Sequence, residues 1–215
     1  FQGVLSATTA PALGSAACRA AIDAAGIQAN EVDETIMGCV LPAGLGQAPA
    51  RQAAMGAGVP VATPATTINK MCGSGMKAAM LGHDIIRAGA ARVTVTGGLE
   101  SMSNAPYLLP KARAGYRLGN GELLDHMFVD GLEDAYEPGK LMGHYAEDCA
   151  ERYGFSRKDQ DDFAIESLTR AKEATDSGAF RDEITPVSIV GRKETVTVEF
   201  DEQPLNANIE KIPHL

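Results

Sequence analysis

The 215-residue sequence contains no tryptophan, and its four cysteines include no Cys-x-x-Cys pair. Zinc sites and thioredoxin-like redox sites commonly use such pairs, so we expect neither of them and no metal ion. No hydrophobic run approaches the ~18 apolar residues of a membrane span, and the first residues lack the charged-then-apolar pattern of a signal peptide. We therefore expect a cytoplasmic protein with reduced thiols.

A basic surface is also missing from this chain. The formal net charge is −9 and the pI is about 4.9, which argues against nucleic acid or an anionic membrane as the main partner. Hydrophobic residues make up 45% of the chain, which is enough for one large domain or two small ones with a buried core. Abundant alanine and glycine are compatible with a layered α/β protein.

The N-terminal part of the chain alternates between helix and strand signals. Residues 11–25 predict a helix, because Thr9 can cap it, Pro11 suits its first turn and Gly26 suits its end. Further helices are predicted at residues 48–57 and 76–89, and strands at residues 35–41, 66–68 and 92–96. The succession of strand, helix and strand around residues 66–96 indicates a right-handed β-α-β unit.

From Asn104 onward the composition changes, with prolines and a glycine-rich segment, so a second domain is expected to begin there. Helices are predicted near residues 143–153 and 156–177, the second with a Ser156–Asp159 capping box and Gly178 at its end. Residues 187–190 and 195–198 alternate around Gly191 and predict a hairpin. The predicted domains are thus residues 1–103 and 104–215.

Cys72 lies where a strand signal gives way to a helix signal. The β-branched residues 66–68 favour a strand, whereas Met76 and its successors favour a helix. Gly73 and Gly75 allow a tight turn between them. A helix N-terminus presents unpaired N–H groups and about half a positive charge, which favours a thiolate nucleophile. Cys72 is therefore the candidate nucleophile, and the alternative is that it is a small buried hydrophobic residue, as most free cysteines are.

The residues around this cysteine resemble the acyl-cysteine motif of the thiolases, the family of acetyl-CoA acetyltransferases and 3-ketoacyl-CoA thiolases. The motif reads Asn-Lys-Met-Cys-Gly-Ser-Gly over residues 69–75. Four other stretches resemble the family in the same order along the chain, namely Gly-Gln-Ala-Pro-Ala-Arg-Gln (46–52), Gly-Gly-Leu-Glu-Ser-Met-Ser-Asn (97–104), Leu-Met-Gly (141–143) and Ser-Arg-Lys-Asp-Gln-Asp (156–161). Five stretches in a fixed order make the resemblance specific.

The resemblance implies an α/β protein with the layered α-β-α-β-α thiolase fold, in which residues 1–103 form the core with the nucleophile. Residues 104–215 would be the loop domain, used for CoA binding and tetramerisation and truncated here. The C-terminal half, which supplies the base histidine and a second cysteine in the family, is expected to be absent from this chain. His83 cannot replace that base, because it lies roughly 16 Å along its helix from Cys72. We therefore expect residues 1–215 by themselves to be inactive and unable to fold independently.

The implied activity is acyl-CoA:acetyl-CoA C-acyltransfer, which forms or cleaves acetoacetyl-CoA or a longer 3-ketoacyl-CoA through an acyl-cysteine at Cys72. The backbone N–H of Cys72 would belong to the oxyanion hole, and Leu141 and Met142 would contact the substrate. Leu141 departs from the histidine that acetoacetyl-CoA thiolases often have here. The Asp201–Glu202 pair is likewise not followed by the basic residue often found near the CoA adenine. Acyl-chain length and reaction direction therefore stay open.

The implied partners are acetyl-CoA, acyl-CoA and CoA in fatty acid metabolism, with no cofactor beyond CoA as substrate or product. Residues 111–124 resemble the loop through which many thiolases form homotetramers, so a dimer or tetramer is expected; the alternative is an ordinary surface hairpin. Residues 47–52 and 100–104 are expected to pack at interfaces. Two other functions compete: a ketoacyl synthase, which has the same fold and a cysteine nucleophile but uses carrier-protein substrates, and a non-catalytic acyl-CoA-binding or oligomerising module.

Overall fold

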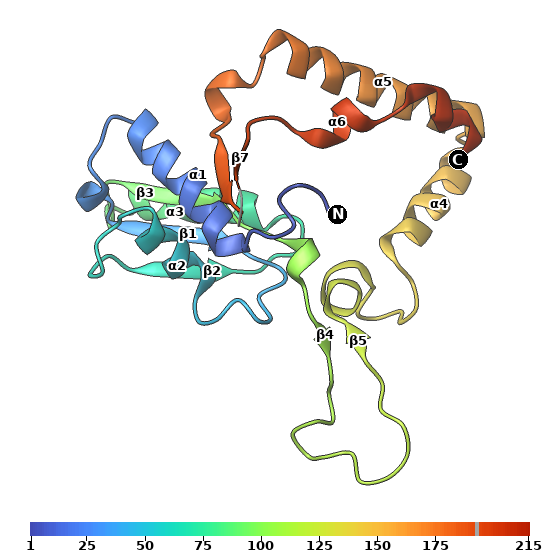
Figure 1. Ribbon diagram of the computed structural model, residues 1–215, viewed down its shortest axis with the longest axis horizontal. Helices are drawn as coiled ribbons and strands as arrows, with labels where there is room; N and C mark the ends of the chain where they lie inside the picture. The colour runs from blue at the N-terminus through green and yellow to red at the C-terminus, as the bar shows by residue number, and fades with distance from the viewer. Residues whose placement is uncertain (192–193) are drawn as a thin grey trace. The chain divides into compact units, whose positions relative to one another are not determined.

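The computed structural model describes residues 1–191 and 194–215, which form two compact units, Phe1–Ala135 and Tyr136–Leu215. Figure 1 labels most of the helices and strands of the two units. Contacts divide the chain after Ala135, whereas the predicted boundary at residues 103/104 separates two functional parts and stays a prediction.

Unit 1 is built on a three-stranded parallel sheet with the strand order β2-β1-β3. The strands are β1 (Glu34–Gly38), β2 (Ala65–Ile68) and β3 (Thr94–Gly98). In the central register, Ile36 lies opposite Thr66 on one side and Thr96 on the other. The parallel sheet with intervening helices confirms the predicted α/β class and the β-α-β unit. The remaining layers of the five-layer fold stay a prediction.

Helices cover both faces of this sheet. They are α1 (Ala10–Ala24), α2 (Pro49–Gly56) and α3 (Ser74–Arg87). Val93 and Val95 of the β3 region face the cluster made by α1 and α2, whereas Thr94 and Thr96 face Gly82 of α3. Because successive side chains of a strand point to opposite faces, α3 packs on the face away from α1 and α2. The main core lies on the α1–α2 side and contains Ala10, Cys18, Met37, Cys39, Ala50, Ala53, Ala57 and Leu99.

The helix ends follow the local signals of the sequence. The Thr9 side chain accepts a hydrogen bond from the Ala12 N–H at 3.4 Å, and Gly26 has a φ of +68°. Left-handed backbone of this kind follows many helices and is easiest for glycine. The predicted helices at residues 11–25, 48–57 and 76–89 are therefore confirmed to within two residues at each end.

Two predicted strands are displaced in the structure. Strand β1 ends at Gly38, not at Leu41, because the backbone N–H groups of Val40 and Leu41 donate to the Glu100 carboxylate instead of to a neighbouring strand. Strand β3 begins at Thr94, not at Arg92, because the N–H groups of Arg92 and Val93 donate to Asp33. In both cases a distant carboxylate takes the donors that a strand would need.

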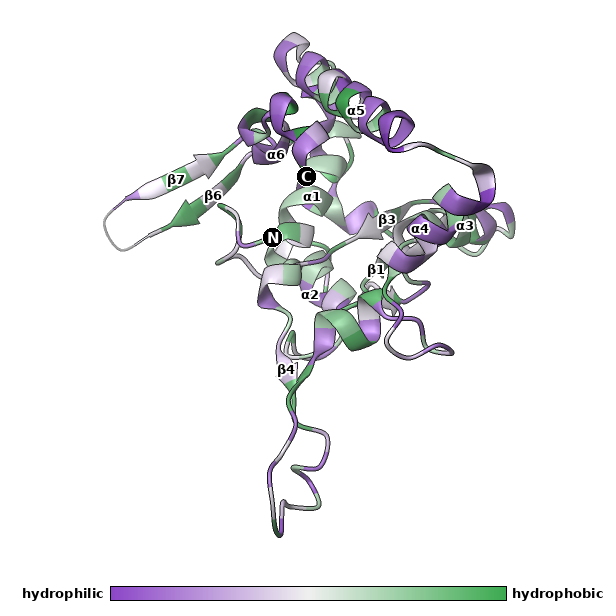
Figure 2. Ribbon diagram, turned by 90° about the vertical axis from the view of Figure 1, so that its right-hand side faces the viewer, coloured by the Kyte–Doolittle hydropathy of each residue, from purple (hydrophilic) through white to green (hydrophobic). Residues whose placement is uncertain are grey.

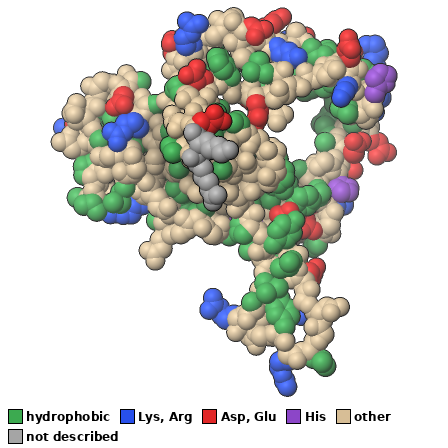
Figure 3. Space-filling model, in the orientation of Figure 1, with side chains coloured by type: hydrophobic (Ala, Val, Ile, Leu, Met, Phe, Trp, Pro, Cys, Tyr) green, Lys and Arg blue, Asp and Glu red, His purple; other side chains and the backbone are tan. Residues whose placement is uncertain are grey.

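The end of unit 1 contains a long hairpin. Strand β4 (Tyr107–Leu108) pairs with the antiparallel strand β5 (Leu124–Asp125), and residues 109–123 connect them. A 3-10 turn η1 (Ala29–Glu31) follows α1, a 3-10 turn η2 (Met102–Asn104) precedes the hairpin, and a π-helical turn η3 (Phe128–Leu132) follows it. Hydrophobic side chains are exposed along the hairpin (Figure 3), with Leu118 97% exposed at its tip.

Unit 2 consists of helices and a separate hairpin. Its elements are α4 (Met142–Tyr153), α5 (Arg157–Ser177), η4 (Arg181–Glu183), β6 (Val187–Val190), β7 (Thr195–Val198), α6 (Glu202–Asn206) and η5 (Ile209–His214). The β6–β7 pair is the predicted hairpin, and the predicted capping box of α5 is present, with the Ser156 side chain accepting from the Asp159 N–H. Helix α5 is mostly hydrophilic (Figure 2). Among the residues that the structure describes, no helix is long and apolar enough to cross a membrane.

Candidate active site

Cys72 lies in the turn that connects β2 to α3. Strand β2 ends at Ile68, Gly73 occupies the N-cap position and the helix begins at Ser74. The Cys72 residue is exposed to solvent. The predicted position at a helix N-terminus is therefore confirmed, and the bland alternative of a buried cysteine is not what the structure shows. The role of Cys72 as nucleophile stays a prediction.

Glycines bring the start of α3 close to the carboxyl ends of the strands. A Cβ atom added at Gly38, the last residue of β1, would lie 2.5 Å from the Cβ of Ser74 and 2.7 Å from its carbonyl carbon. A Cβ atom at Gly98, the last residue of β3, would lie 3.7 Å from the Cα of Gly75. Carboxyl ends of parallel strands are common ligand-binding edges in α/β proteins. The start of α3, which Cys72 precedes, thus lies at such an edge, and the close approach at Gly38 leaves no room for a side chain there.

Side chains on both sides of Cys72 fix the backbone of the turn. Met71 has a φ of +49°, in the left-handed region that non-glycine residues seldom adopt. The Asn69 Oδ1 accepts a hydrogen bond from the Met71 N–H at 2.9 Å. The Ser74 Oγ accepts from the Lys70 N–H at 2.8 Å and donates to the Met71 carbonyl oxygen at 2.6 Å. The turn is therefore closed by two side chains of the motif itself.

Glu100 stabilises the loop that follows β1. Its carboxylate accepts hydrogen bonds from the Val40 N–H at 2.8 Å and the Leu41 N–H at 3.0 Å. The buried Cys39 thiol lies 3.6 Å from the same carboxylate. Burial, and secondly the negative charge of Glu100, raise the pKa of Cys39 to about 12. Cys39 is therefore a neutral core thiol at physiological pH.

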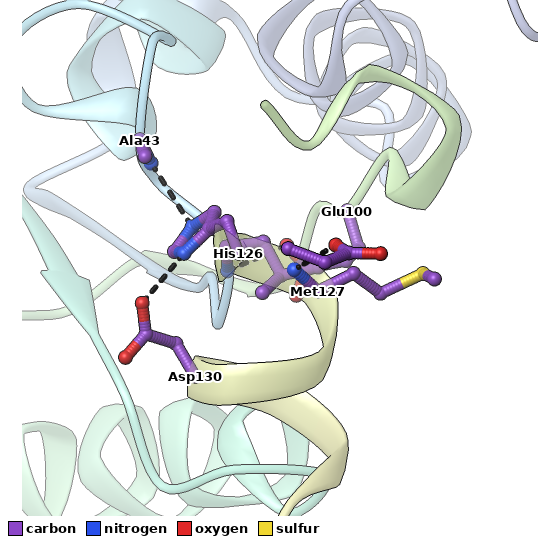
Figure 4. Close-up of polar contacts among 7 residues, drawn as sticks. Ala43, Glu100, His126, Met127 and Asp130 are labelled. Carbon is purple, nitrogen blue, oxygen red and sulfur yellow. Dashed lines mark hydrogen bonds and ion pairs between the residues drawn. The ribbon is translucent and has the colours of Figure 1, made fainter. Parts of the chain in front are cut away.

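His126 lies in the same region and makes hydrogen bonds there (Figure 4). It is 4% exposed, and its Nδ1 lies 2.6 Å from Oδ2 of Asp130. Its Nε2 accepts a hydrogen bond from the Ala43 N–H at 3.4 Å. Both ring nitrogens thus have partners within unit 1, which gives His126 a structural role there.

Each of the other three histidines either has a hydrogen-bonding partner within its own unit or is exposed there. His83 is exposed on α3 and its Nδ1 pairs with Asp84. The Nδ1 of His144 accepts a hydrogen bond from the Leu141 N–H at 3.1 Å, so it helps to cap α4. His214 is exposed near the end of η5.

Leu141 and Met142 lie in unit 2, whereas Cys72 lies in unit 1. Leu141 is the N-cap residue of α4, and Met142 begins that helix and is 45% exposed. Met142 is therefore accessible to solvent. The predicted contact of both residues with a substrate bound at Cys72 stays a prediction.

The remaining motif stretches hydrogen-bond to loops of their own chain. The Gln52 Nε2 donates to the carbonyl oxygens of Leu45 and Gln47, both at 2.8 Å. The Asn104 Nδ2 donates to the carbonyl oxygens of Ser6 and Thr8 at 2.9 and 3.1 Å. These contacts give both stretches an internal structural role, and their expected roles at interfaces stay predictions.

Among the described residues, no group of three or more His, Cys, Asp or Glu side chains could hold a metal ion.

The structure thus defines an α/β unit with an exposed cysteine at the carboxyl edge of its parallel sheet, a candidate site for a cysteine nucleophile. Comparison with known proteins identifies the family. Residues 1–215 match the thiolase N-terminal domain. An acetyl-CoA acetyltransferase of Pseudomonas aeruginosa is 51% identical over 205 residues, which cover 95% of this chain and 52% of the relative. An acetyl-CoA acetyltransferase of Schizosaccharomyces pombe is 49% identical over 214 residues, covering 99% of this chain and 54% of the relative. The mitochondrial acetyl-CoA acetyltransferase A of Xenopus laevis is 48% identical over 217 residues, covering 100% of this chain and 51% of the relative.

The chain therefore belongs to the thiolase family, as its five motif stretches indicated. It spans about half the length of the curated relatives that it matches.

Sequence reasoning missed the contribution of Asn69 and Ser74 to the turn. Both residues stand in the quoted motif, but only Cys72 and the glycines were given a function there. An Asx-turn signal at Asn69 and a serine at the start of a helix are local patterns that could have pointed to side-chain capping. The left-handed backbone of Met71 has no such signal, since methionine does not favour it.

Proposed function

We propose that the protein containing this chain is an acyl-CoA:acetyl-CoA C-acyltransferase of the thiolase type, with Cys72 as the acylated residue. The observation that carries the proposal is the exposed Cys72 thiol at the N-terminus of α3, at the carboxyl edge of the sheet. Membership of the thiolase family and the names of the relatives, acetyl-CoA acetyltransferases, support the same activity.

In the proposed first step, the Cys72 thiolate attacks the carbonyl carbon of an acyl-CoA thioester. The carbonyl π electrons move to oxygen, the bond to the CoA sulfur then breaks, and the CoA thiolate leaves and takes up a proton. We propose that N–H groups at the start of α3, including that of Cys72, stabilise the oxyanion that develops. The product is an acyl-cysteine thioester and free CoA, which are close in energy to the reactants because one thioester replaces another.

In the second step the acyl group passes to the α-carbon of an acetyl-CoA, whose α-proton goes to a base, and Cys72 is released as the thiolate. The reverse sequence cleaves a 3-ketoacyl-CoA with CoA. His83, His126 and His144 have other hydrogen-bonding partners, and we propose that a group outside residues 1–215 supplies the base. A general base contributes typically 10²- to 10⁴-fold to such a step.

The proposed substrates are acetyl-CoA, acyl-CoA and CoA, with acetoacetyl-CoA or a longer 3-ketoacyl-CoA as the other product. We propose that Leu141 and Met142 contact the substrate, that no metal or further cofactor takes part, and that the reaction serves fatty acid metabolism. We further propose a cytoplasmic location, which subcellular fractionation can test, since one of the relatives is named as mitochondrial.

Self-association is part of the proposal. The β4–β5 hairpin exposes apolar side chains, including Leu118 and Tyr107, and a loop of this kind can bury them against a copy of itself. We propose a dimer or tetramer that forms through residues 111–124. Sedimentation of the complete protein with and without Leu118→Asp tests this, since a lower oligomeric state is expected for the variant.

Thiolysis of acetoacetyl-CoA by the complete protein tests the activity and separates it from the two alternatives. A thiolase cleaves acetoacetyl-CoA in the presence of CoA, and this cleavage should be lost in Cys72→Ala. A ketoacyl synthase would instead use a malonyl-carrier substrate without cleaving acetoacetyl-CoA, and a non-catalytic module would bind CoA without turnover. Either result would contradict the proposal. The names of the relatives favour neither alternative.

A further inference from the structure

Met71 has an unfavourable backbone conformation in the turn between β2 and α3 that contains Cys72. Its φ of +49° places a long, unbranched side chain in the left-handed region, immediately before Cys72. Such a backbone persists in a non-glycine residue only where surrounding contacts enforce it. The contacts around Met71 should therefore show which side chains enforce it.

The Ser74 hydroxyl bonds to both sides of this residue. It accepts from the Lys70 N–H at 2.8 Å and donates to the Met71 carbonyl oxygen at 2.6 Å. The same carbonyl oxygen also accepts from the Ser74 N–H at 3.0 Å. Ser74 is 4% exposed, so water does not readily replace these bonds if the hydroxyl is lost.

The Met71 carbonyl and the Cys72 N–H belong to one peptide group. Because a trans peptide is planar, its C=O and N–H bonds point in opposite directions and rotate together. Two donors from Ser74 fix the direction of the carbonyl, so they also fix the direction of the Cys72 N–H. Ser74 therefore orients a backbone donor that it does not itself touch.

We propose that Ser74 is a positioning residue that aims the Cys72 N–H at the oxyanion formed during acylation of Cys72. The inference rests on the proposed function, in which the Cys72 N–H binds that oxyanion. A serine suits this position because a hydroxyl can donate and accept at once. Its short side chain also fits against Gly38, where an added Cβ would meet the Ser74 Cβ at 2.5 Å.

The test compares two reactions of the same Cys72 thiol in the complete protein. Acetylation by acetyl-CoA develops an oxyanion, whereas alkylation by iodoacetamide at sulfur does not. Loss of one oxyanion-hole donor typically costs 10²- to 10³-fold, so Ser74→Ala, which only misaims the donor, should slow Cys72 acetylation by about 10- to 100-fold. Alkylation of Cys72 should change by less than about threefold, since it needs no oxyanion donor.

One further variant controls for removal of a hydroxyl group. Ser15→Ala removes a hydroxyl that donates to the Pro11 carbonyl oxygen at 2.8 Å within α1, and it should leave both Cys72 reactions unchanged. If Ser15→Ala slowed Cys72 acetylation as much as Ser74→Ala does, the effect would not be specific to the Ser74 hydroxyl, and this would overturn the inference.

The remaining outcomes separate this inference from the proposed function. If the unaltered protein forms no acetyl adduct at Cys72, the proposed function fails and the inference fails with it. If the unaltered protein is acetylated and Ser74→Ala is acetylated at the same rate, only the inference fails. Equal slowing of acetylation and alkylation would assign Ser74 a merely structural role and would also overturn it.

Discussion

Unit 1 and unit 2 differ in what stabilises them. Unit 1 contains two clusters of buried hydrophobic residues, in which residues far apart in the sequence, such as Cys18, Ala53 and Leu99, meet. Of the residues that the structure describes in unit 2, Pro204 alone is buried. Helices α4 and α5 both end in a left-handed glycine, and α5 begins with a capping box.

The difference separates long-range packing from local helix stabilisation. On the surface of α5, ion pairs four residues apart join Arg157 to Asp161, Lys158 to Asp162 and Glu166 to Arg170. Each such pair contributes little to stability, because solvent screens exposed charges. Unit 1 should therefore respond strongly to changes of volume, whereas unit 2 should respond mainly to changes in caps and charges.

The largest difference in stability between the two units is expected when one glycine in each unit is replaced by alanine. Gly38→Ala in unit 1 places a Cβ 2.7 Å from backbone of Ser74, and overpacking of this kind should cost about 3 kcal/mol. Gly143→Ala in α4 of unit 2 meets no atom within 4 Å and should be neutral or stabilising by up to about 1 kcal/mol. Thermal and urea unfolding of both variants measure the difference. Equal loss of stability in the two variants would contradict the comparison.

Removing a cap should weaken unit 2 at one helix end. In Ser156→Ala the Asp159 N–H loses its acceptor at 3.2 Å, and we expect a loss of about 1 kcal/mol. Hydrogen exchange should accelerate in the first turn of α5 and remain unchanged in unit 1. Ser177→Ala, at the opposite end of the helix, removes a weaker bond of 3.4 Å and should change stability by less than about 0.5 kcal/mol.

Unit 1 contains a buried polar group whose removal should raise the stability of the unit. Thr35 lies fully buried in β1, and its hydroxyl has no hydrogen-bond partner within the described parts of the chain. Thr35→Val keeps the shape and suits a strand, so we expect a gain of up to about 1 kcal/mol in the free energy of unfolding. Thr63→Val should instead cost about 1 kcal/mol, because that hydroxyl donates to the Val32 carbonyl oxygen at 3.2 Å. Opposite signs in calorimetry would confirm the prediction.

The smallest expected effect is a change in how stability depends on pH in the acid range. Hydrogen bonds from the backbone N–H groups of Arg92 and, secondly, Val93 lower the pKa of Asp33 in unit 1, and hydrogen bonds from Ser156 lower the pKa of Asp159 in unit 2. A carboxyl with a lowered folded-state pKa adds stability above its unfolded pKa of about 4, and this stability disappears as the pH falls through the folded value.

Both aspartates should therefore stabilise the folded state at pH 7 and lose this effect below about pH 4. The two should differ in how much of the structure they stabilise. Asp33→Asn should reduce the acid sensitivity of unit 1 as a whole, because Asp33 joins segments about 60 residues apart. Asp159→Asn should alter only the first turn of α5. Hydrogen exchange measured from pH 7 to pH 3 distinguishes the two, and an effect of Asp159→Asn throughout the protein would contradict the comparison.

Sequence reasoning succeeded where a structure depends on neighbouring residues. Thr9 and Gly26 located α1, and Ser156 and Gly178 located α5, because a cap acts within one turn of its helix. Strand ends were displaced because their donors go to Glu100 and to other side chains distant in the sequence. Such pairings have no local signal.

The candidate site shows the same division. A strand-to-helix turn with glycines placed Cys72 correctly at the start of α3. The contact of Ser74 with Gly38, in contrast, depends on how β1 packs against α3. Tertiary contacts of this kind cannot be predicted from the motif alone.

Peptide mapping after exposure of the complete protein to acetyl-CoA tests the central claim, that Cys72 is the acylated nucleophile. Cys72 is exposed and follows β2 at the start of α3, whereas Cys18 and Cys39 are buried and Cys149 lies exposed on α4 as a matched internal control. We predict one acetyl group, on Cys72, which is discharged by added CoA and is absent from Cys72→Ala. An acetyl group on Cys149 or elsewhere in the chain, or one that persists in Cys72→Ala, would contradict the claim.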